Sequence, residues 1–338
     1  MPASNRKTMK WYTISWMDFL VELHLFTSNL LLKASQWKIF SSNLNRELSL
    51  MKIITFRHKN NIKAGVLTDK NRIIIKDDSP DAINAVLNLI EGEKGTSPWQ
   101  GGETTLDLED VELLAPIPEP RRNIFCVGKN YYAHAKEFND SGFDTSTKEE
   151  IPSVPVIFTK ATTSVIGHNA PINSSLDNTN SVDYECELCF IIKKRAHKVE
   201  RSEAFKYIFG YTILNDVTAR HLQQKHNQWF LGKSLDSFAP LGPVIVSVDE
   251  LPDITDAKIS TTVNGEVRQQ AQIADLIFDI PTLMETLTAT MTLIPGDIIA
   301  TGTPVGVGLG FKPPKFLKPG DTVSVSVDGI GVLTNPVI

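Results

Sequence analysis

The chain has 338 residues, enough for one large domain or two medium ones. Apolar residues make up 41% and charged residues 22%, as in an ordinary globular protein, and the net charge of −5 argues against a nucleic-acid partner. Three cysteines are too few for a disulfide framework, which favours a reducing compartment. No window of about 18 uncharged apolar residues occurs, so neither a membrane span nor a membrane partner is expected.

Residues 1–50 differ in composition from the rest of the chain. They carry six Lys and Arg against three Asp and Glu and hold three of the five tryptophans, whereas the remaining chain is net acidic. We interpret them as an N-terminal extension, either a mitochondrial-type presequence or the product of a mispredicted start codon, and an integral helical arm is the alternative. The expected location is therefore the cytoplasm, or the mitochondrion if residues 1–50 are a presequence.

Residues 51–119 are expected to form a small N-terminal α/β domain. The segment 51–77 has short apolar runs joined by polar turns, which predicts strands, and DAINAVLNLIEG at 81–92 has helical periodicity. A polar linker follows that helix, and the proline-rich LLAPIPEPRR at 113–122 predicts an extended connection. A second, catalytic domain is then expected over 120–338.

Strand-like runs dominate this second domain. They are NIFCVG, PVIFTK, ECELCFII, FGYTILND, GPVIVS, KISTTVNG, GDIIATG and TVSVSVDG. The best helical patterns are EAFKYIF, VTARHLQQKHN and IPTLMETLTATM. Many strands with few helices predict a β-rich α+β fold rather than a doubly wound sheet.

Residues 182–190 read VDYECELCF, a strand-like stretch that carries two glutamates. Side chains alternate across a strand, so Glu185 and Glu187 point the same way, about 6–7 Å apart. A third acid, Asp216, ends the strand-like GYTILND. Three carboxylates from two strands, without a His or Cys ligand, suit a hard divalent cation such as Mg²⁺, Mn²⁺ or Ca²⁺ rather than zinc. Exposed carboxylates at a sheet edge are the alternative.

Cys186 and Cys189 form a CxxC pair in the same stretch. No second CxxC occurs in the sequence, and side chains three residues apart on a strand face opposite sides. We therefore interpret both cysteines as small apolar residues of a packed sheet rather than as a redox or zinc site.

The chain also contains six longer motifs. They are CVGKNYYAHAKEF, VDYECELCF, GYTILNDVTARHLQ, FLGKSLDSFAPLGP, GDIIATGTPVGVG and KPPKFLKPGDTVSVSVDGIGVLTN. Their order and spacing resemble the fumarylacetoacetate hydrolase family, particularly its fumarylacetoacetate hydrolase domain-containing subgroup, strongly over 120–338 and loosely over 51–119. The resemblance implies a mixed β-sandwich or β-roll, a homodimer, and a divalent metal, Mg²⁺ or alternatively Mn²⁺ or Ca²⁺, on Glu185, Glu187 and Asp216.

His134 and Glu137 are three residues apart in a helix-like stretch, so their side chains can touch, although exposed HxxE pairs are common on helices. The resemblance implies a catalytic dyad on a lid segment, in which the carboxylate orients the imidazole as a base. The polar run NDSGFDTSTKEE at 139–150 fits the hinge of such a lid.

Lys233 lies between glycine-bearing turns, and the resemblance implies that it stabilises negative charge on a substrate oxygen near the metal. A surface lysine is the alternative. Arg220 follows Asp216 at i+4 and either pairs with it or binds a substrate carboxylate, with Gln223 assisting.

Two further residues are expected to contact the substrate. The glycine-rich GDIIATGTPVGVG lacks the Lys-Ser/Thr of a phosphate loop, and the resemblance makes its Thr303 a substrate contact, whereas a plain tight turn is the alternative. Lys129 stands where many members of the family have arginine, and it keeps the charge but loses the bidentate geometry. This departure leaves the identity of the substrate open.

The resemblance as a whole implies a metal-dependent enzyme that acts on small 2-oxo or β-dicarbonyl acids through an enolate held by the metal. Acylpyruvate hydrolysis and oxaloacetate tautomerisation or decarboxylation are the favoured reactions, because His134 can either deliver water or move a proton. A muconate-type isomerase of aromatic catabolism is one alternative. A catalytically inactive, metal-stabilised binding domain is the other.

Overall fold

The computed structural model describes residues 52–77, 79, 82–91, 104–143 and 149–338. All of them belong to one compact unit, Leu50–Ile338. The predicted extension at 1–50 lies outside the described residues, and so does 144–148 within the predicted hinge. The interpretations of the extension and of the hinge therefore stay predictions.

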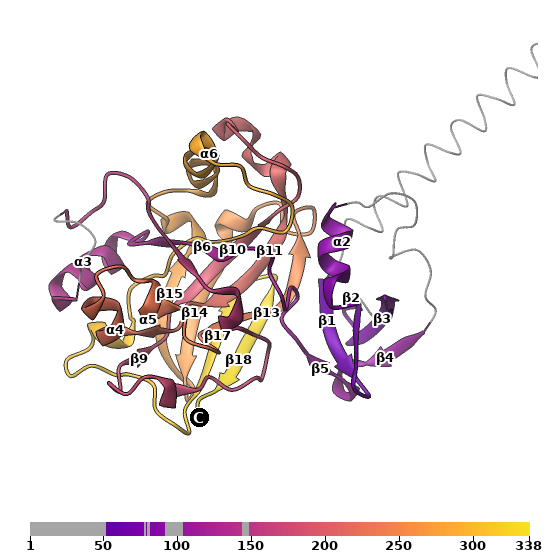
Figure 1. The fold of residues 1–338 in the computed structure, drawn as a ribbon, viewed down its shortest axis with the longest axis horizontal. Coiled ribbons are helices and arrows are strands. Elements are labelled where there is room, and N and C mark those ends of the chain that lie inside the picture. Colours follow the sequence, from indigo (N-terminus) through magenta and orange to yellow (C-terminus); the bar gives the residue numbers. More distant parts are fainter. Residues whose placement is uncertain (1–51, 78, 80–81, 92–103, 144–148) are drawn as a thin grey trace, which may run out of the picture. The chain divides into compact units, whose positions relative to one another are not determined.

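Eighteen strands occur among the described residues, and most of them follow the apolar runs of the sequence (Figure 1). The first five are β1 (Lys52–His58), β2 (Asn61–Leu67), β3 (Arg72–Asp77), β4 (Thr105–Asp107) and β5 (Glu112–Leu113). The others are β6 (Ile124–Gly128), β7 (Val156–Lys160), β8 (Val165–Ile166), β9 (Val182–Asp183), β10 (Cys186–Ile192), β11 (Ile208–Asn215), β12 (Thr218–Ala219), β13 (Ala239–Ser247), β14 (Lys258–Val263), β15 (Glu266–Gln272), β16 (Ile298–Ala300), β17 (Thr322–Val327) and β18 (Gly331–Pro336).

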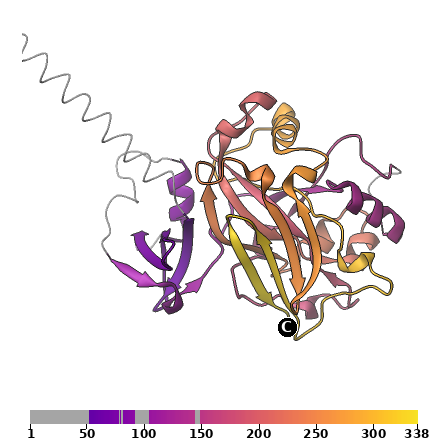
Figure 2. The ribbon, with the colours of Figure 1, turned by 180° about the vertical axis from the view of Figure 1, so that it is seen from behind.

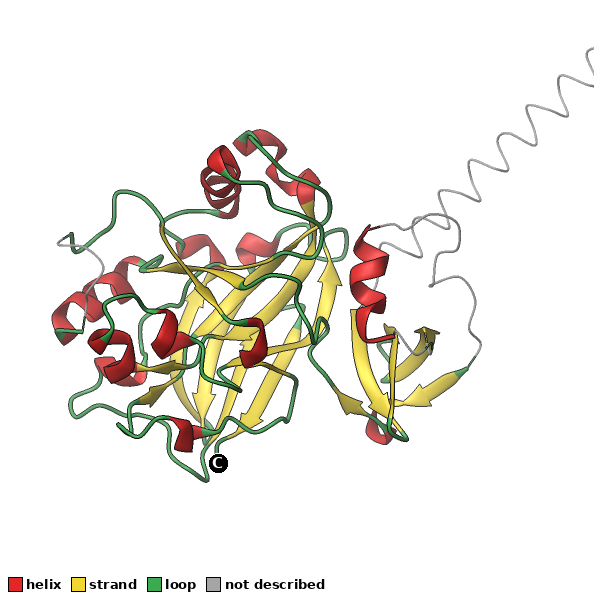
Figure 3. Cartoon of the chain, in the orientation of Figure 1, coloured by secondary structure: helices red, strands yellow, loops and turns green. Residues whose placement is uncertain are grey.

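The described α-helices are few and short. They are α2 (Ala85–Glu91), α3 (Tyr132–Ser141), α4 (Arg220–Lys225), α5 (Phe230–Lys233) and α6 (Ile280–Thr290). The start of α6 is set by its sequence, because the Asp279 side chain accepts a hydrogen bond from the Thr282 amide at 2.9 Å and a proline occupies the first turn. Figure 3 shows α3 to α6, in red, at the periphery of the yellow strands that follow β6.

The strands form two large sheets. The first has twelve strands in the order β4-β3-β2-β1-β13-β11-β10-β16-β6-β7, with β5 paired to β1 and β8 to β13. The second has four strands, β15-β14-β17-β18, and Figure 2 shows it with β17 and β18 in yellow. A separate ladder joins β9 and β12. Most ladders are antiparallel, but β16 pairs with β6 in parallel, so the first sheet is mixed.

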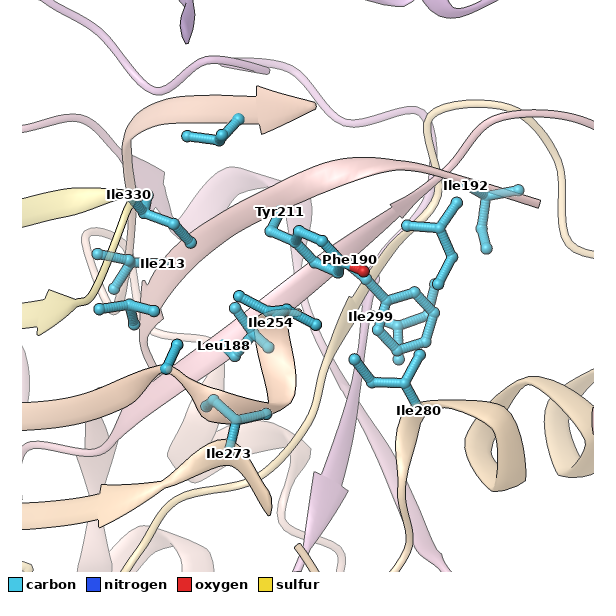
Figure 4. Packing of buried hydrophobic residues seen from close by; sticks show 14 of the residues in the cluster. Leu188, Phe190, Ile192, Tyr211, Ile213, Ile254, Ile273, Ile280, Ile299 and Ile330 are labelled. Atoms are coloured by element: carbon cyan, nitrogen blue, oxygen red, sulfur yellow. The ribbon is translucent and has the colours of Figure 1, made fainter. Parts of the chain in front are cut away.

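The main hydrophobic core is built on the alternation of β10. Leu188, Phe190 and Ile192 belong to it and pack with Tyr211 and Ile213 of β11 (Figure 4). The four-stranded sheet contributes Ile259, Val325, Val327 and Leu333. Burial of each such side chain contributes roughly 1.5–3 kcal/mol. The two sheets therefore share one core, which confirms the predicted β-rich sandwich architecture.

The same alternation turns Glu187 away from this core. Neighbouring side chains on a strand face opposite sides, so Glu187, Cys189 and Ile191 project from the other face of β10, and none of them belongs to the core cluster. The two cysteines of the CxxC pair accordingly lie on opposite faces. A buried acid can occupy this second face only if polar partners surround it, and it is here that the candidate site lies.

Two segments differ from the sequence-based expectation. EAFKYIF, expected to be helical, instead lies in the 3-10 helix Arg201–Tyr207 and, with its last two residues, in strand β11. The apolar pattern also does not predict β15, whose sequence is EVRQQAQ. This strand lies at the edge of the four-stranded sheet, and Gln269 is its one fully buried residue. An edge strand with exposed side chains needs no apolar alternation, so its sequence resembles a loop.

Candidate active site

The three carboxylates of the predicted metal site come from the facing ends of β10 and β11. Glu185 directly precedes β10, Glu187 is its second residue, and Asp216 directly follows β11. The antiparallel ladder pairs Cys186 with Asn215, which brings the two strand ends together. One carboxylate oxygen from each acid lies within 4.8 Å of the other two, and all three side chains are buried. Exposed edge carboxylates, the alternative explanation, are thereby excluded.

Two buried lysines contact this cluster. The Lys233 Nζ lies 2.8 Å from the Glu185 Oε2 and 2.7 Å from the Asp216 Oδ2. The Lys160 Nζ, from the end of β7, lies 2.6 Å from the Asp216 Oδ1. It also donates to the backbone carbonyls of Val217, at 3.0 Å, and of Lys233. Lys233 is therefore not a surface lysine, and Lys160 is a site residue that the sequence-based reasoning missed.

The pKa values of Glu185 and Glu187 are shifted in opposite directions, because the neighbouring cations contact only Glu185. Burial raises the pKa of Glu185, but Lys233 and Arg220 outweigh burial and hold that pKa at about 2. Burial, together with Asp216 and Glu185, raises the pKa of Glu187 well above its usual value. Among the described residues no ion pair reaches Glu187, and its carboxylate accepts a hydrogen bond from the Gly302 amide at 2.9 Å.

The donor set fits a hard divalent cation. Glu185, Glu187 and Asp216 offer oxygen ligands alone, at a place where one buried carboxylate lacks a cationic side chain among the described residues. Mg²⁺, Mn²⁺ and Ca²⁺ take such ligands, whereas zinc favours nitrogen and sulfur. The described part of the chain contains no other cluster of metal-ligating side chains.

The two cysteines of the CxxC pair behave as packed thiols. Burial raises the pKa of Cys186 to about 12 and also raises the pKa of Cys189.

Arg220 does not pair with Asp216, one of the two predicted alternatives. Its Nε lies 2.9 Å from the Asp183 Oδ2, and its Nη1 lies 2.6 Å from the Glu185 Oε1 and 3.3 Å from the Gln223 Oε1. Asp216 instead pairs with the two lysines. The Arg220 Nη2 is buried and has no hydrogen-bond partner among the described residues, so it remains available to a ligand.

His134 and Glu137 lie in contact on α3. The His134 Nδ1 is 3.2 Å from the Glu137 Oε2, and the imidazole is stacked on Phe138 with ring centroids 6.0 Å apart. The Gly306 amide donates to the Glu137 Oε1 at 3.0 Å, which ties α3 to the glycine-rich loop. His134 is buried and Glu137 is largely buried, so the pair is not the exposed HxxE of a helix surface.

Most of these groups line one narrow cleft. Eight of the ten predicted site residues are in its wall: Lys129, His134, Glu185, Glu187, Arg220, Gln223, Lys233 and Thr303. Phe138, Phe158 and Trp229 add an aromatic wall that the motifs did not indicate, with Trp229 edge-on to both phenylalanines. Glu137 and Asp216 are not in the wall, but they contact His134 and Lys233, which are.

Lys129 and Thr303 are both buried at the cleft but already have protein partners. The Lys129 Nζ donates to the Glu149 carbonyl at 2.7 Å. The Thr303 Oγ1 accepts a hydrogen bond from the Gln269 Nε2 at 2.8 Å.

Gly302, beside Thr303, has a backbone that only glycine accommodates here. Its φ is 104°, and a Cβ would lie 2.7 Å from the Asn130 Cβ and 2.9 Å from the Val127 carbonyl oxygen. This close approach lets the Gly302 amide reach Glu187. Asn130 donates to the Thr301 carbonyl at 2.7 Å and secures the same turn. The glycine motif therefore shapes the carboxylate cluster rather than a phosphate site.

Comparison with known proteins agrees with this geometry. The family model "Fumarylacetoacetate (FAA) hydrolase C-terminal" matches residues 123–338, and the model "Rv2993c-like, N-terminal" matches residues 51–116. The first match covers more than half of the chain, so the protein belongs to the fumarylacetoacetate hydrolase family.

Individual relatives specify the class further. The chain is 46% identical over 236 residues to the oxaloacetate tautomerase YisK of Bacillus subtilis, covering 70% of this chain and 76% of that one. The structure of a fumarylacetoacetate hydrolase from Exiguobacterium antarcticum is similar with a TM-score of 0.71 at 39% identity, covering 85% of this chain and 99% of that one. A maleylpyruvate hydrolase from Sphingobium sp. SYK-6, solved with manganese(II) and pyruvate, has a TM-score of 0.67 at 27% identity, covering 85% and 99%.

These findings confirm the predicted family, fold and enzyme class: a metal-dependent enzyme for small oxo acids. The relatives named above are bacterial, which gives the mitochondrial alternative no support. Within the described residues no helix has the length and apolarity to cross a bilayer. The domain boundaries, the homodimer and the roles of individual site residues stay predictions.

Proposed function

We propose that the protein is a keto–enol tautomerase of oxaloacetate or of closely related 2-oxo acids, with Mg²⁺ as its metal and Mn²⁺ as an effective substitute. One observation carries the proposal: two acids of a three-carboxylate cluster, a buried arginine whose Nη2 has no partner among the described residues, and a histidine in contact with Glu137 line the same cleft. The relative at 46% identity is an oxaloacetate tautomerase. The cytoplasm is the proposed location.

Substrate binding follows from the charges of the cleft. Glu185, Glu187 and Asp216 would hold the dication, which supplies Lewis acidity that polarises a 2-oxo group and stabilises negative charge on its oxygen. The Arg220 Nη2 is the donor best placed for a substrate carboxylate, because its other nitrogens are already bonded to Asp183 and Glu185. A small acid is favoured because the cleft is narrow and three aromatic rings, those of Phe138, Phe158 and Trp229, occupy part of its wall.

The proton transfer is assigned to His134. Because the Nδ1 faces the Glu137 carboxylate at 3.2 Å, the ring carries its proton on that nitrogen and presents a basic Nε2. In the enol-to-keto direction the Nε2 takes the enol O–H proton and the imidazolium returns a proton to C3, while the C2–O bond becomes C=O and the C2=C3 bond becomes single. Atoms and charge are conserved over the cycle, and the aromatic wall limits the access of bulk water.

Hydrolysis of acylpyruvates is the second candidate. The similarity to the maleylpyruvate hydrolase with bound manganese(II) and pyruvate favours it, because the same His134 and Glu137 pair can activate a water for attack on a carbonyl carbon. The two reactions differ in whether the Nε2 of His134 receives a proton from the substrate or from water. Substrate comparison is therefore needed to separate them.

The test is a substrate panel with the full-length protein and added Mg²⁺ or Mn²⁺. Enol-oxaloacetate, acetylpyruvate and maleylpyruvate are each followed by loss of enol absorbance, with pyruvate and oxaloacetate quantified as products. We expect accelerated ketonisation of enol-oxaloacetate. Glu185→Gln should abolish turnover and weaken Mn²⁺ binding in calorimetry, and His134→Ala should lower kcat by about 10²–10⁴-fold.

Glu200→Gln, an exposed acid outside the cleft, is the matched control and should behave as the wild type. If acetylpyruvate or maleylpyruvate is cleaved faster than enol-oxaloacetate is ketonised, the protein is an acylpyruvate hydrolase and not a tautomerase. Unchanged turnover by Glu185→Gln would refute the metal-dependent mechanism altogether.

A further inference from the structure

Asp183 is a fourth buried acid beside the site, outside the group of three potential metal ligands. Its Oδ1 accepts hydrogen bonds from the Tyr184 amide at 2.9 Å and the Gly308 amide at 2.6 Å. Its Oδ2 accepts from the Leu309 amide at 2.9 Å and from the Arg220 Nε at 2.9 Å. Four donors surround one carboxylate, so its position is defined from three separate chain segments.

The contact with Arg220 fixes the plane of the guanidinium group. That group is flat, and two of its three nitrogens are occupied, the Nε by Asp183 and the Nη1 by Glu185. Because the Nε and the Nη1 are both hydrogen-bonded, the orientation of the planar group, and with it the direction of the third nitrogen, is fixed. This nitrogen, the Nη2, is the one that lacks a partner among the described residues. Asp183 therefore decides where the free donor of Arg220 points.

The loop contacts connect the same carboxylate to the histidine dyad. Asp183 binds two successive amides of the loop, those of Gly308 and Leu309. A Cβ at Gly308 would lie 2.6 Å from the Asp183 Oδ1, so position 308 requires glycine. Two residues earlier, the Gly306 amide holds the Glu137 carboxylate. One buried acid thus secures the loop that contacts the dyad and the arginine that faces the cleft.

We propose that Asp183 is a positioning residue that orients Arg220 toward a substrate carboxylate and anchors the loop on which Glu137 rests. The proposal rests on the proposed function of Arg220 as a carboxylate ligand. It assigns Asp183 no contact with the substrate or the metal. Loss of its negative charge should leave the guanidinium free to rotate, so binding of the acid substrate should suffer more than the proton transfer.

The kinetic test uses Asp183→Asn in the full-length protein with Mn²⁺. We expect KM for enol-oxaloacetate to rise by about 10–100-fold, since a charge-assisted hydrogen bond of 1.5–3 kcal/mol depends on the orientation of Arg220. The fall in kcat should be smaller. In an Arg220→Met background the same substitution should raise KM no further, because the group it orients is gone. Equal KM effects in both backgrounds would overturn the proposal.

Asp177→Asn is the matched control. Asp177 is also buried, and its two oxygens accept hydrogen bonds from Thr179 and Ser181, but it does not line the cleft. Its substitution should lower stability without a selective rise in KM. A selective rise there as well would show that loss of any buried aspartate in this segment produces the effect, and the assignment to Asp183 would fail.

A measurement independent of turnover is the ¹⁵N resonance of the Arg220 Nε–H, assigned by its disappearance in Arg220→Lys. We expect slow exchange with solvent in the wild type and faster exchange in Asp183→Asn. Rapid exchange in the wild type would refute the Asp183 contact even if the variant failed to fold. The two proposals can also be separated. If the Arg220 Nε–H exchanges slowly in the wild type and rapidly in Asp183→Asn, but the wild type turns over none of the panel acids, the positioning role is upheld and the proposed function is refuted.

Discussion

Glu185 and Glu187 share one side of a strand but differ in what surrounds them. Glu185 contacts Lys233 and Arg220, and these cations hold its pKa at about 2 against the effect of burial. Glu187 has the Gly302 amide, and burial with two neighbouring carboxylates raises its pKa. A bound dication therefore matters most to Glu187, because this is the acid whose charge the described side chains compensate least.

Replacing Glu187 by glutamine should thus have opposite effects with and without metal. In the presence of a chelator we expect Glu187→Gln to be at least as stable as the wild type, because a neutral amide replaces a buried carboxylate. Saturating Mn²⁺ should stabilise the wild type, by about 2.7 kcal/mol at a hundredfold excess over Kd, and leave the variant unchanged. Urea denaturation with EDTA or MnCl₂ measures both.

The contribution of Glu187 to the stability of the metal-free protein should depend on pH. The folded pKa of Glu187 is raised, so the folded state binds the proton more tightly than the unfolded chain, whose value is about 4.3. Its contribution to stability is present below that value and is lost as pH rises through the folded pKa. Metal-free wild type should therefore lose stability relative to Glu187→Gln as pH rises. The reverse trend would show that protein partners hold the charged form.

Strand β15 contacts the site through the hydrogen bonds of one side chain, that of Gln269. The Gln269 Oε1 accepts from the Cys186 amide at 3.1 Å and from the Thr261 Oγ1 at 2.8 Å. Its Nε2 donates to the Thr303 Oγ1 and to the Pro304 carbonyl, both at 2.8 Å. This amide joins the start of β10 to the turn that carries Thr303, so the four-stranded sheet and the cleft are connected by hydrogen bonds as well as by the core.

Gln269→Leu should therefore destabilise the protein by about 2–4 kcal/mol, because several buried partners lose their hydrogen bonds at once. The control is Gln270→Leu on the opposite, exposed face of the same strand, which should stay within about 0.5 kcal/mol of the wild type. Free energies of unfolding from urea titration provide the comparison. Equal effects of the two substitutions would show that the buried network contributes nothing specific.

The motifs already indicated most of the elements that carry the site, but not this one. Strands β6, β10 and β11 have local apolar patterns that the core then buries, and α3 was indicated by its His–Glu spacing. In contrast, β15 is polar because it lies at an edge, and its pairing with β14 is decided by a partner elsewhere in the chain. Propensity within a short window holds no information about such a partner.

At the level of the whole molecule, every described site residue lies between Val127 and Leu309, inside the unit Leu50–Ile338. The two family models begin at residue 51 and end at residue 338. A chain that starts at Met51 should therefore fold and show wild-type kcat/KM and thermal stability. Activity assays and thermal melts of the two chain lengths test this, and mass spectrometry of the native N-terminus shows which of them exists. A truncated chain that aggregates or loses activity would favour the integral helical arm.

The spacing of residues along the chain placed the candidate metal ligands and the candidate dyad side by side, but it left exposed carboxylates and an exposed His–Glu pair as alternatives. Two acids at i and i+2 share a strand face, and a His and a Glu at i and i+3 share a helix face, because these periods are properties of the backbone itself. The resemblance of the motifs then supplied the chemistry, which the relatives confirmed at the level of the enzyme class.

The partners of these residues were decided by strand register and packing alone. Lys160 reaches Asp216 across 56 residues, Arg220 reaches Asp183 across 37, and no local pattern distinguishes these side chains from solvated ones. A shift of the strand register by one residue would move the whole set of acids to the other face of the sheet. Which charges meet inside the molecule is therefore a property of the assembled sheets, because contacts between distant segments depend on every strand that lies between them.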